Sequence, residues 1–456
     1  MKASGMRKTI EELGRRLGGL EVHTEPGLRL SYNFDATGRR GEALGVVFPE
    51  EQGQLATVVR EAGRLGLPLF MRGAGTGFSG GSVPVGGGLV VSTEKMRKVF
   101  SFAPEEGTVE VECGIVNNEL QCFLEPRGFF FPSDPASLKV STIGGNIAEN
   151  AGGPRAFKYG VTRRHVRSLV WIAPSGEILE TPMEGPAALL AGSEGTLGVI
   201  YSARLSVLPL PEAREVSLVL AGSDENAMRT ASALLAGGLR PGVMEFIDSK
   251  TLGCVGEYRS VRGLDTGESC LFLEFDGPLR DVEAQSRMLD DFCRRERLFK
   301  ISARGRVESD ILWDLRRSIS PSLARKGITK INEDVALPLG RLGDAVAFIH
   351  SAARELGLDC YIFGHCGDGN LHVNILTDRR RHEEMSRSEL FVGRLFEKVA
   401  AMGGSLSGEH GIGMTKNRYL GLLFREGEIR MQQGVRSAFD PAGFINPGKY
   451  FSGICS

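Results

Sequence analysis

The hydrophobic and polar positions along the chain fall into two regions with different periodicity. From about residue 40 to 210, short runs of β-branched and apolar residues alternate with glycine-rich loops, a pattern typical of strands joined by turns. Leu55, Val59 and Ala62 recur at helical spacing in EEQGQLATVVREAGRLG and predict one amphipathic helix. The expected strands of this region are ALGVVFP, LPLFMRG, GLVVS, TVEVECG and SLVWIAP.

Beyond a proline-containing stretch at 208–211, longer helical patterns alternate with single strands. The expected helices are ENAMRTASALLAG, DVEAQSRMLDDFCRRERL, SDILWDLRRSI, GDAVAFIHSAAREL and SELFVGRLFEKVAAM. The expected strands are CLFLEF, DVALP, DCYIFGH and LHVNIL. Helices layered on a mostly antiparallel sheet account for this order most economically, so we expect an α+β domain here.

Composition narrows the class of protein. The 456 residues are 41% hydrophobic and 24% charged, which is typical of a soluble globular chain with two or three domains. A formal net charge of -1 argues against a nucleic-acid partner. The N-terminus lacks the apolar core of a signal peptide, and no apolar run approaches the roughly 20 residues of a membrane span, so we expect a cytoplasmic protein. The 8 cysteines form no CxxC pair, which argues against an iron–sulfur cluster of its own.

Glycine is unusually frequent, with 61 residues, and is gathered into loops. The sharpest loop, RGAGTGFSGG at 72–81, directly follows the strand LPLF. Its backbone N–H groups can form an anion-binding concavity, and the missing side chains let a phosphate approach. No helix follows the loop and no GK[ST] occurs, so it is neither a Rossmann fingerprint nor a Walker loop.

Two more loops of small residues occur in the same region. PSDP at 132–135 leads into STIGGNIAENAGG at 141–153, and GSEGTLGVI occupies 192–200. Three such loops within one β-rich domain predict an extended ligand with many backbone contacts. A dinucleotide that carries a flat ring system fits this description.

The densest group of chemically active side chains is YIFGHCGDGNLHVN at 361–374. As a hairpin with its turn at 367–370, this segment places His365 directly across from His372, close enough to share one metal ion. Glu409, in SGEHGIG, is a candidate third ligand, and the adjacent His410 points in another direction. Two nitrogens and one oxygen suit zinc, manganese or iron.

These motifs together resemble a known family. RGAGTGFSGG, STIGGNIAENAGG, YGVTRRHV, GSEGTLGVI, GHCGDGNLH and SGEHGIG are similar to those of vanillyl-alcohol-oxidase-type flavoproteins, and more closely to their FAD-dependent D-2-hydroxy-acid dehydrogenase branch. That branch includes D-lactate dehydrogenase, the catalytic subunit of glycolate oxidase and D-2-hydroxyglutarate dehydrogenase. The resemblance covers about residues 40–450.

The resemblance implies an α+β fold in which a two-part FAD-binding domain precedes an α+β substrate domain, the latter an antiparallel sheet covered by helices. The expected divisions are a helical segment at 1–39, the FAD-binding domain at 40–211, and the substrate and metal domain at 212–449, whose C-terminal tail returns to the flavin. The FAD is expected to be non-covalent, because the first glycine loop lacks the histidine that attaches it in some relatives. Ala74 and Phe78 depart mildly from the Gly and Leu usual in the family.

The resemblance also implies roles for individual residues. His365, His372 and Glu409 would bind the metal, with zinc favoured, and His410 would be the catalytic base. The implied substrate-binding residues are Arg316, on a helix whose apolar face we assign to Ile311 and Leu315, Ser320 one turn further, Lys330 and Asn374. The implied FAD-binding residues are Arg72, Gly73, Ala74, Gly75, Thr76, Gly77, Ser79, Gly80, Pro132, Ser133, Asp134, Thr142, Gly145, Asn146, Ala148, Gly152, Gly153, Ile200 and Asn446.

The implied reaction is metal-assisted oxidation of a D-2-hydroxy acid, with D-lactate or glycolate favoured, to the 2-oxo acid by hydride transfer to the flavin. D-2-Hydroxyglutarate is the alternative and needs a second cation, for which Lys330 and Arg317 are candidates. Electrons would pass to a separate acceptor: an iron–sulfur subunit, an electron-transferring flavoprotein, or a membrane quinone reached through a partner. A non-catalytic flavoprotein subunit, a metal hydrolase and an ether-lipid synthase of the same superfamily are the competing hypotheses.

Overall fold

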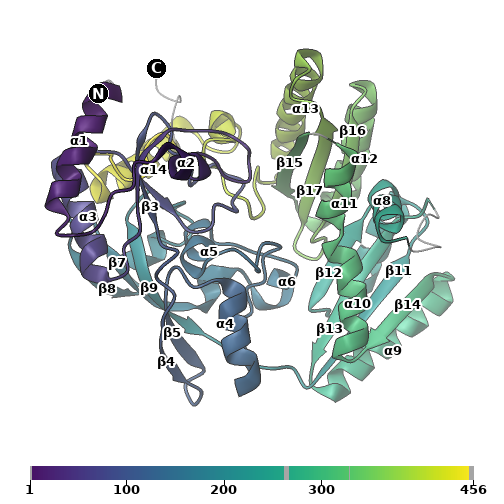
Figure 1. Ribbon diagram of the computed structural model, residues 1–456. Helices are drawn as coiled ribbons and strands as arrows, with labels where there is room; N and C mark the ends of the chain where they lie inside the picture. Colours follow the sequence, from purple (N-terminus) through teal and green to yellow (C-terminus); the bar gives the residue numbers. More distant parts are fainter. Residues whose placement is uncertain (1–2, 261–266, 328, 451–456) are drawn as a thin grey trace. The chain divides into compact units, whose positions relative to one another are not determined.

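The computed structural model describes residues 3–260, 267–327 and 329–450, which form two compact units (Figure 1). Unit 1 contains the chain up to Gly152, then Gly160–Pro209, and the segment that begins at Glu409. Unit 2 contains Gly153–Tyr159 and Leu210–Gly408. The chain therefore leaves and re-enters unit 1 twice.

The first part of unit 1 is a three-stranded parallel sheet in the order β1 (Ala43–Val47), β3 (Gly88–Ser92) and β2 (Leu69–Arg72). Helices α1 (Ala3–Arg16) and α3 (Gln52–Arg64) pack on it. Leu55, Val58 and Val59 are fully buried, so the predicted amphipathic face of α3 is confirmed. Strands buried on both faces are typical of a parallel arrangement and explain their nearly continuous apolar sequences.

The second part of unit 1 is an antiparallel sheet of five strands. Val109, Leu169 and Ala203 lie in its core, under α4 (Asn117–Leu124) and α5 (Ile143–Glu149). The strand order is β4 (Val99–Ala103), β5 (Thr108–Glu112), β9 (Val199–Ser206), β7 (Val166–Ile172) and β8 (Ile178–Pro182). The shorter elements of the unit are α2 (Pro26–Ser31), η1 (Glu125–Arg127), β6 (Phe129–Phe130), η2 (Thr162–His165), η3 (Pro186–Leu189), β10 (Leu208–Pro209) and η5 (Asn417–Leu422).

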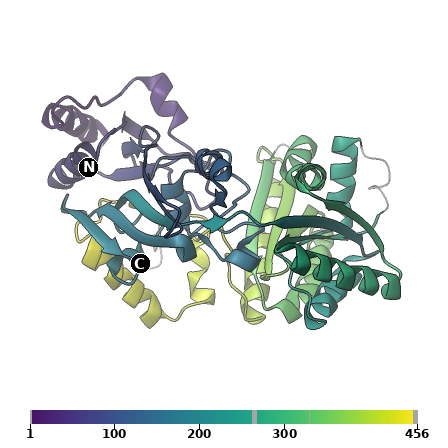
Figure 2. The same ribbon diagram turned by 90° about the horizontal axis from the view of Figure 1, so that it is seen from below.

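The C-terminal segment, yellow in Figure 2, completes unit 1. The ring of Phe439, at the end of α14 (Glu426–Phe439), lies 6.0 Å from that of Trp171 on β7. Beyond the helix, Ile445 forms a bridge with Leu69, the first residue of β2. The tail thus touches both sheets of the unit.

Unit 2 is built on a seven-stranded sheet in which every neighbouring pair is antiparallel. This confirms the expected α+β architecture. The strand order is β14 (Phe299–Arg304), β11 (Ala213–Leu220), β13 (Cys270–Gly277), β12 (Val243–Ile247), β16 (Asp359–Gly364), β17 (Asn370–Thr377) and β15 (Thr329–Ala336).

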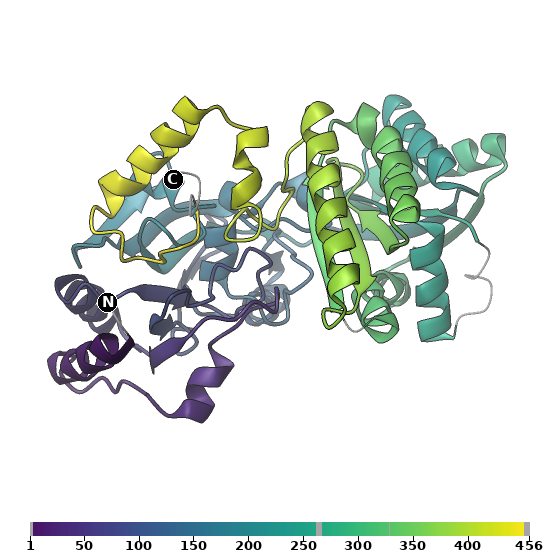
Figure 3. The ribbon, with the colours of Figure 1, turned by 90° about the horizontal axis from the view of Figure 1, so that it is seen from above.

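Helices cover both faces of this sheet (Figure 3). On one face, α8 (Ser249–Arg259), α10 (Arg306–Arg317) and α11 (Ile319–Lys326) enclose an apolar core that includes Phe272 and Phe363. The short α6 (Ala156–Tyr159) contacts β12, and η4 (Leu339–Arg341) precedes α12. On the opposite face lie α7 (Asp224–Ala236), α9 (Leu279–Glu296), α12 (Leu342–Glu355) and α13 (His382–Ala401).

The assignment of an apolar face to Ile311 and Leu315 of α10 is wrong for Ile311, whereas Leu315 is partly buried against the core. Ile311 is 62% exposed, whereas Leu312, Trp313 and Arg316 are buried together with Ser309. Positions 309, 312, 313 and 316 follow the i, i+3, i+4, i+7 spacing of one helix face. The bulk of Leu312 and Trp313 decides which face turns inward, and Arg316 is buried with them. In the part of the chain that the structure describes, no helix is both long and apolar enough to cross a membrane.

The core beneath α10 depends on Phe272, whose ring packs edge-on against that of Trp313 at 4.9 Å. Phe272→Ala should lower the free energy of unfolding by about 3–5 kcal/mol, because a fully buried ring leaves a cavity. Urea denaturation followed by circular dichroism measures this loss. Phe299→Ala, on the edge strand of the same sheet where Phe299 is 61% exposed, is the control and should change stability far less. Equal losses in both variants would contradict the prediction.

Candidate functional site

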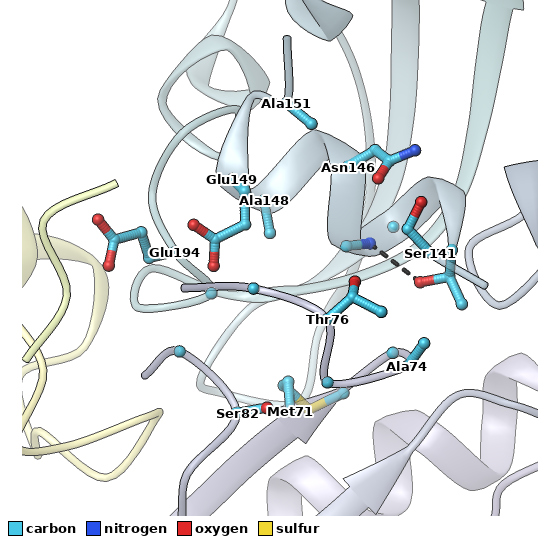
Figure 4. A pocket seen from close by; sticks show the side chains of 18 of the residues that line it. Met71, Ala74, Thr76, Ser82, Ser141, Asn146, Ala148, Glu149, Ala151 and Glu194 are labelled. Atoms are coloured by element: carbon cyan, nitrogen blue, oxygen red, sulfur yellow. Dashed lines mark hydrogen bonds between the residues drawn. The ribbon is translucent and has the colours of Figure 1, made fainter. Parts of the chain in front are cut away.

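The three glycine-rich loops of unit 1 come together around one pocket (Figure 4). Its wall is formed by the loop after β2, the segment around α5, the start of β9, and residues of the C-terminal segment. Thirteen of the predicted FAD-binding residues line it: Arg72, Gly73, Ala74, Gly75, Thr76, Gly77, Thr142, Gly145, Asn146, Ala148, Gly152, Ile200 and Asn446. The other six, all within the described part of the chain, lie outside the pocket wall: Ser79, Gly80, Pro132, Ser133, Asp134 and Gly153.

Local geometry explains why the first loop is rich in glycine. A Cβ on Gly73 would lie 2.3 Å from Oγ1 of Thr142, so only glycine lets the loop approach the start of α5. Thr142 caps that helix, since its Oγ1 accepts the N–H of Gly145 at 3.2 Å. The loop after β2 and the helix that follows the second loop are thus packed against each other.

Glu409 and His410 line the same pocket. The ring of Phe78 stacks on that of His410, with centroids 4.8 Å apart and planes 28° from parallel. A Cβ on Gly152 would lie 2.9 Å from Oε2 of Glu409, which explains the glycine at that position. Phe78 is a residue that sequence reasoning noted as a departure from the family pattern without assigning it a role.

Two buried carboxyl groups stand side by side at one end of the pocket (Figure 4). Glu149 accepts a hydrogen bond from Ser79 at 3.0 Å, and Glu194 accepts the N–H of Ile412 at 2.7 Å. A Cβ on Gly411 would lie within 2.9 Å of both carboxylates, and this residue has φ +87°. Burial, with the mutual repulsion of the pair, raises the pKa of Glu149 well above its usual value, and burial raises that of Glu194.

Lys449 belongs to the same buried group. Its Nζ donates to the carbonyl oxygens of Gly80 and Val83. Burial lowers its pKa to about 8, even though Asp35 and the two glutamates favour the charged form. The lysine therefore joins the first glycine loop to the C-terminal tail. Asn446 does the same through amide hydrogen bonds to the carbonyls of Gly81 and Glu194, each 2.9 Å.

In unit 2, the two predicted histidine ligands meet, although not by the expected register. β16 ends at Gly364, and the residue across from His372 is Phe363 rather than His365. His365 lies in the connecting turn, where its carbonyl accepts the N–H of Asn370 at 3.1 Å. The turn is longer than predicted, which moves His365 beyond the last strand pair. Its ring nevertheless points back toward β17, and the Nε2 atoms of His365 and His372 are 3.4 Å apart.

This spacing fits metal coordination. Two nitrogens, each about 2.0–2.1 Å from a tetrahedral zinc ion, are about 3.3 Å apart. Both histidines are at most 5% exposed. The last residue of the unit, Gly408, is fixed nearby, because its N–H donates to Oδ2 of Asp334 at 2.7 Å and Asp334 pairs with His372 across the strands.

Glu245 on β12 was not found from the sequence. It is 0% exposed, and its Oε1 is hydrogen-bonded to Nδ1 of His365 while its Oε2 accepts Nε of Arg316 at 2.7 Å. Burial alone would raise the pKa of Glu245, but the charges of Arg316 and His365 outweigh it and lower the pKa to about 2. A single glutamate in an apolar strand gives no signal in the sequence that distinguishes it from a solvent-facing residue.

The predicted substrate-binding residues have different surroundings. Asn374 is fully buried and lies across from Asn332, next to His372 on the same sheet face. Lys330 is half-buried across from Leu376, two register steps beyond His372, and burial lowers its pKa. Ser320, in α11, is exposed. Arg317 is also exposed and lies 3.4 Å from Asp314.

A pocket of glycine-rich loops within a mixed β-sheet unit, followed by a helix-covered antiparallel sheet, agrees with the class of flavin-dependent oxidoreductases that the motifs resemble. Residues 43–182 match the family described as FAD binding domain, and residues 210–450 match FAD linked oxidases, C-terminal domain. The chain belongs to the FAD-linked oxidases and, within them, to the FAD-dependent 2-hydroxy-acid dehydrogenase family. The resemblance stated from the motifs is thereby confirmed.

Three curated relatives carry different substrate names. Glycolate oxidase subunit GlcD of Bacillus subtilis (strain 168) is 34% identical, covering 93% of this chain and 92% of the relative. D-lactate dehydrogenase of Anaerostipes hadrus is 31% identical, covering 87% of each chain. D-2-hydroxyglutarate dehydrogenase of Stutzerimonas stutzeri (strain A1501) is 31% identical, covering 97% of this chain and 98% of the relative. These identities show the family and leave the substrate open.

A solved structure confirms the expected fold. The 4-ethylphenol oxidase of Gulosibacter chungangensis, in complex with isoeugenol, aligns with a TM-score of 0.80 over 98% of this chain and 97% of its own. At 15% identity, this similarity concerns the vanillyl-alcohol-oxidase-type fold alone.

The buried carboxyl pair predicts a pH effect on stability. The raised pKa of Glu149 means that the folded state binds a proton more tightly than the unfolded state, so stability is lost as pH rises above about 4.5. Glu149→Gln removes this ionisation, and its melting temperature should exceed that of the wild type by more at pH 8 than at pH 5. Differential scanning calorimetry at both pH values measures the gain. The exposed Glu105→Gln is the control, and parallel pH profiles for Glu149→Gln and the wild type would contradict the prediction.

Proposed function

We propose that this protein oxidises a short D-2-hydroxy acid, D-lactate or glycolate, to the 2-oxo acid with metal assistance, and passes the electrons to a separate acceptor. The observation that carries the proposal is the buried pair His365 and His372, with Nε2 atoms 3.4 Å apart, in a chain that also has the pocket of an FAD-binding domain. When bound, FAD would accept the hydride and a divalent metal would acidify the substrate hydroxyl.

Chain connectivity supports Glu409 as the third metal ligand. Gly408 is held by Asp334, the cross-strand neighbour of His372, and Glu409 is the next residue. His410 then follows in the wall of the flavin pocket, stacked on Phe78. Two adjacent residues thus carry the carboxylate that the metal needs and the imidazole that the reaction needs as a base.

The chain's own residues have distinct proposed tasks. His410 would take the hydroxyl proton, a task for which an imidazole is suited near neutral pH. Arg316 would hold the substrate carboxylate, so that the hydrogen on the neighbouring carbon has one orientation. Asn374, buried beside His372, would bind the polar end of the substrate through its amide. The residues proposed to bind FAD, metal and substrate are predictions. The same holds for the functional division of the chain at 1–39, 40–211 and 212–449.

The surroundings of His372 support a short substrate. Its neighbours on the same sheet face are Asp334, directly across from it, and the neutral amides Asn374 and Asn332. Lys330, the nearest candidate for a second carboxylate, lies four residues along β15 from Asp334, which is about 13 Å of strand. Arg317, the other candidate, faces solvent. D-2-Hydroxyglutarate remains the alternative, because Lys330 is a half-buried cation and one relative carries that substrate in its name.

A separate electron acceptor is part of the proposal. The Bacillus subtilis relative is named a subunit of glycolate oxidase, which supports an assembly with other chains. An iron–sulfur subunit, an electron-transferring flavoprotein or a quinone reached through a partner would each serve.

The test is anaerobic bleaching of the visible flavin absorbance of the purified protein with D-lactate, glycolate and D-2-hydroxyglutarate, each added alone. We expect D-lactate or glycolate to bleach it, and His410→Ala to slow the bleaching by about 100-fold or more, because the general base is lost. His382→Ala, an exposed histidine on α13, is the control. A flavin band that none of the three acids bleaches, or one bleached equally fast in His410→Ala, would contradict the proposal.

Lys330 distinguishes the two substrate classes. With D-lactate or glycolate, Lys330→Met should change kcat/KM by less than about fivefold, because the lysine lies beyond the reach of a short acid. If the substrate is a dicarboxylate, the same change should cost tenfold or more, the usual size of a lost charge-assisted hydrogen bond. Steady-state kinetics with an artificial acceptor measure both, with Arg317→Met as the matched control. A loss greater than tenfold with a short acid would contradict the proposed substrate class.

A further inference from the structure

One carboxylate in unit 2 connects the proposed metal site to the proposed substrate clamp. Glu245, at the centre of β12, bonds through Oε1 to Nδ1 of His365 and through Oε2 to both Nε and Nη2 of Arg316. All three side chains are buried, at 9% exposure or less. They come from different elements, since Glu245 is on a strand, His365 in a turn and Arg316 on α10.

Stability alone does not explain this group. The surrounding sheet face is apolar, with Phe272, Phe363 and Ile247 next to it. Burying a charged pair in such a place is often neutral or unfavourable compared with apolar residues of similar size. Glu274 on β13 forms a comparable buried group with Arg155, Arg214 and Trp313. What sets Glu245 apart is that one of its partners is a histidine whose other nitrogen faces a second histidine.

The hydrogen bond fixes which nitrogen of His365 carries the proton. An ionised carboxylate only accepts hydrogen bonds, so Nδ1 of His365 must be the donor. Arg316 contacts Oε2 of Glu245 through both Nε and Nη2, and this cationic partner favours the ionised carboxylate. Nε2 is then the coordinating nitrogen of His365, and it is the atom that lies 3.4 Å from Nε2 of His372.

The same carboxylate fixes the guanidinium. With Nε and Nη2 on Oε2, Arg316 presents its remaining terminal nitrogen in one direction. The guanidinium carbon lies 5.0 Å from the centre of the Phe363 ring, which further restricts the plane of the group. Any shift of Glu245 would therefore move the proposed metal ligand and the proposed clamp together.

We propose that Glu245 is a positioning residue that holds His365 as the Nδ1–H tautomer for metal binding and sets the orientation of Arg316 toward the substrate carboxylate. This inference rests on the proposed function for the identity of the two groups that it positions. It predicts that the metal site and the clamp are built as one unit around a single side chain.

Glu245→Gln is a sharp test because the amide has one acceptor and one donor end. If its oxygen keeps Arg316, its NH₂ group faces Nδ1 of His365 and selects the Nε2–H tautomer. The opposite orientation would place the NH₂ group against the N–H groups of Arg316, so the charged guanidinium favours the first orientation. The amide cannot reproduce both contacts of the carboxylate.

The experiment uses the full-length, FAD-loaded protein with the metal removed by a chelator. Nitrogen-15 shifts of the imidazoles report the tautomer, and the His365 signals are those lost in His365→Ala. We expect Nδ1–H in the wild type and Nε2–H in Glu245→Gln. Zinc is then titrated in competition with a chromophoric chelator. Loss of such an outer partner should weaken zinc binding by about 10–100-fold in the variant.

Glu274→Gln is the matched control, because Glu274 is equally buried in the same sheet face and binds arginines without touching either histidine. It should keep the wild-type tautomer and zinc affinity even if it lowers stability. An unchanged tautomer or unchanged zinc affinity in Glu245→Gln would overturn the inference, as would equal losses in both variants. A wild type that shows Nδ1–H but takes up no zinc would contradict the metal assistance of the proposed function while supporting the tautomer assignment.

Discussion

The burial of charged groups among apolar side chains is the constraint on which both units depend. In unit 2, the carboxylate of Glu245 is tolerated inside an apolar sheet face because His365 and Arg316 satisfy both of its oxygens. In unit 1, burial outweighs the nearby charge of Lys449 and raises the pKa values of Glu149 and Glu194. Ion pairing therefore favours the ionised form of Glu245, whereas burial favours the protonated forms of Glu149 and Glu194.

The chain passes from unit 2 into unit 1 between Gly408 and Glu409. Gly408 is anchored in unit 2 by Asp334, and Glu409 and His410 follow immediately in the wall of the pocket of unit 1. Gly411, which comes next, has positive φ and is framed by Glu149 and Glu194. Asp334 therefore holds Gly408 within unit 2, and Glu149 and Glu194 lie close to Gly411 within unit 1.

Much of the fold could be predicted from the sequence, because its signals are local. Periodicity located α3 and, in unit 2, α7, α9, α10, α12 and α13, and β-branched runs bounded by glycine located β1, β2, β3, β5 and β7. The glycine loops located the pocket for the same reason, since close approach and positive φ leave a mark on the sequence. The family resemblance supplied the FAD, which composition and spacing narrowed only to an extended dinucleotide.

The errors and omissions that affect the site concern tertiary contacts. The register of the histidine hairpin depends on a turn length that His365 and Cys366 do not reveal by themselves. The face of α10 depends on Trp313 and on the buried partner of Arg316, which lies 71 residues away at Glu245. Phe78 stacks on His410 from a loop more than 300 positions earlier, and the pair Glu149 and Glu194 forms between two different glycine loops. A sequence pattern describes neighbouring residues. It does not show which distant segments come into contact in the folded protein.

The contact between Glu245 and Arg316 also bears on how an anionic substrate would be held. The carboxylate cancels the charge of the guanidinium, so Arg316 would provide direction and hydrogen bonds rather than net attraction. Asp334 beside His372 adds a negative charge. The proposed divalent metal would supply the attraction for a substrate carboxylate. In such an arrangement the metal would matter for binding as well as for chemistry, and Lys330 would contribute only for a substrate long enough to reach it.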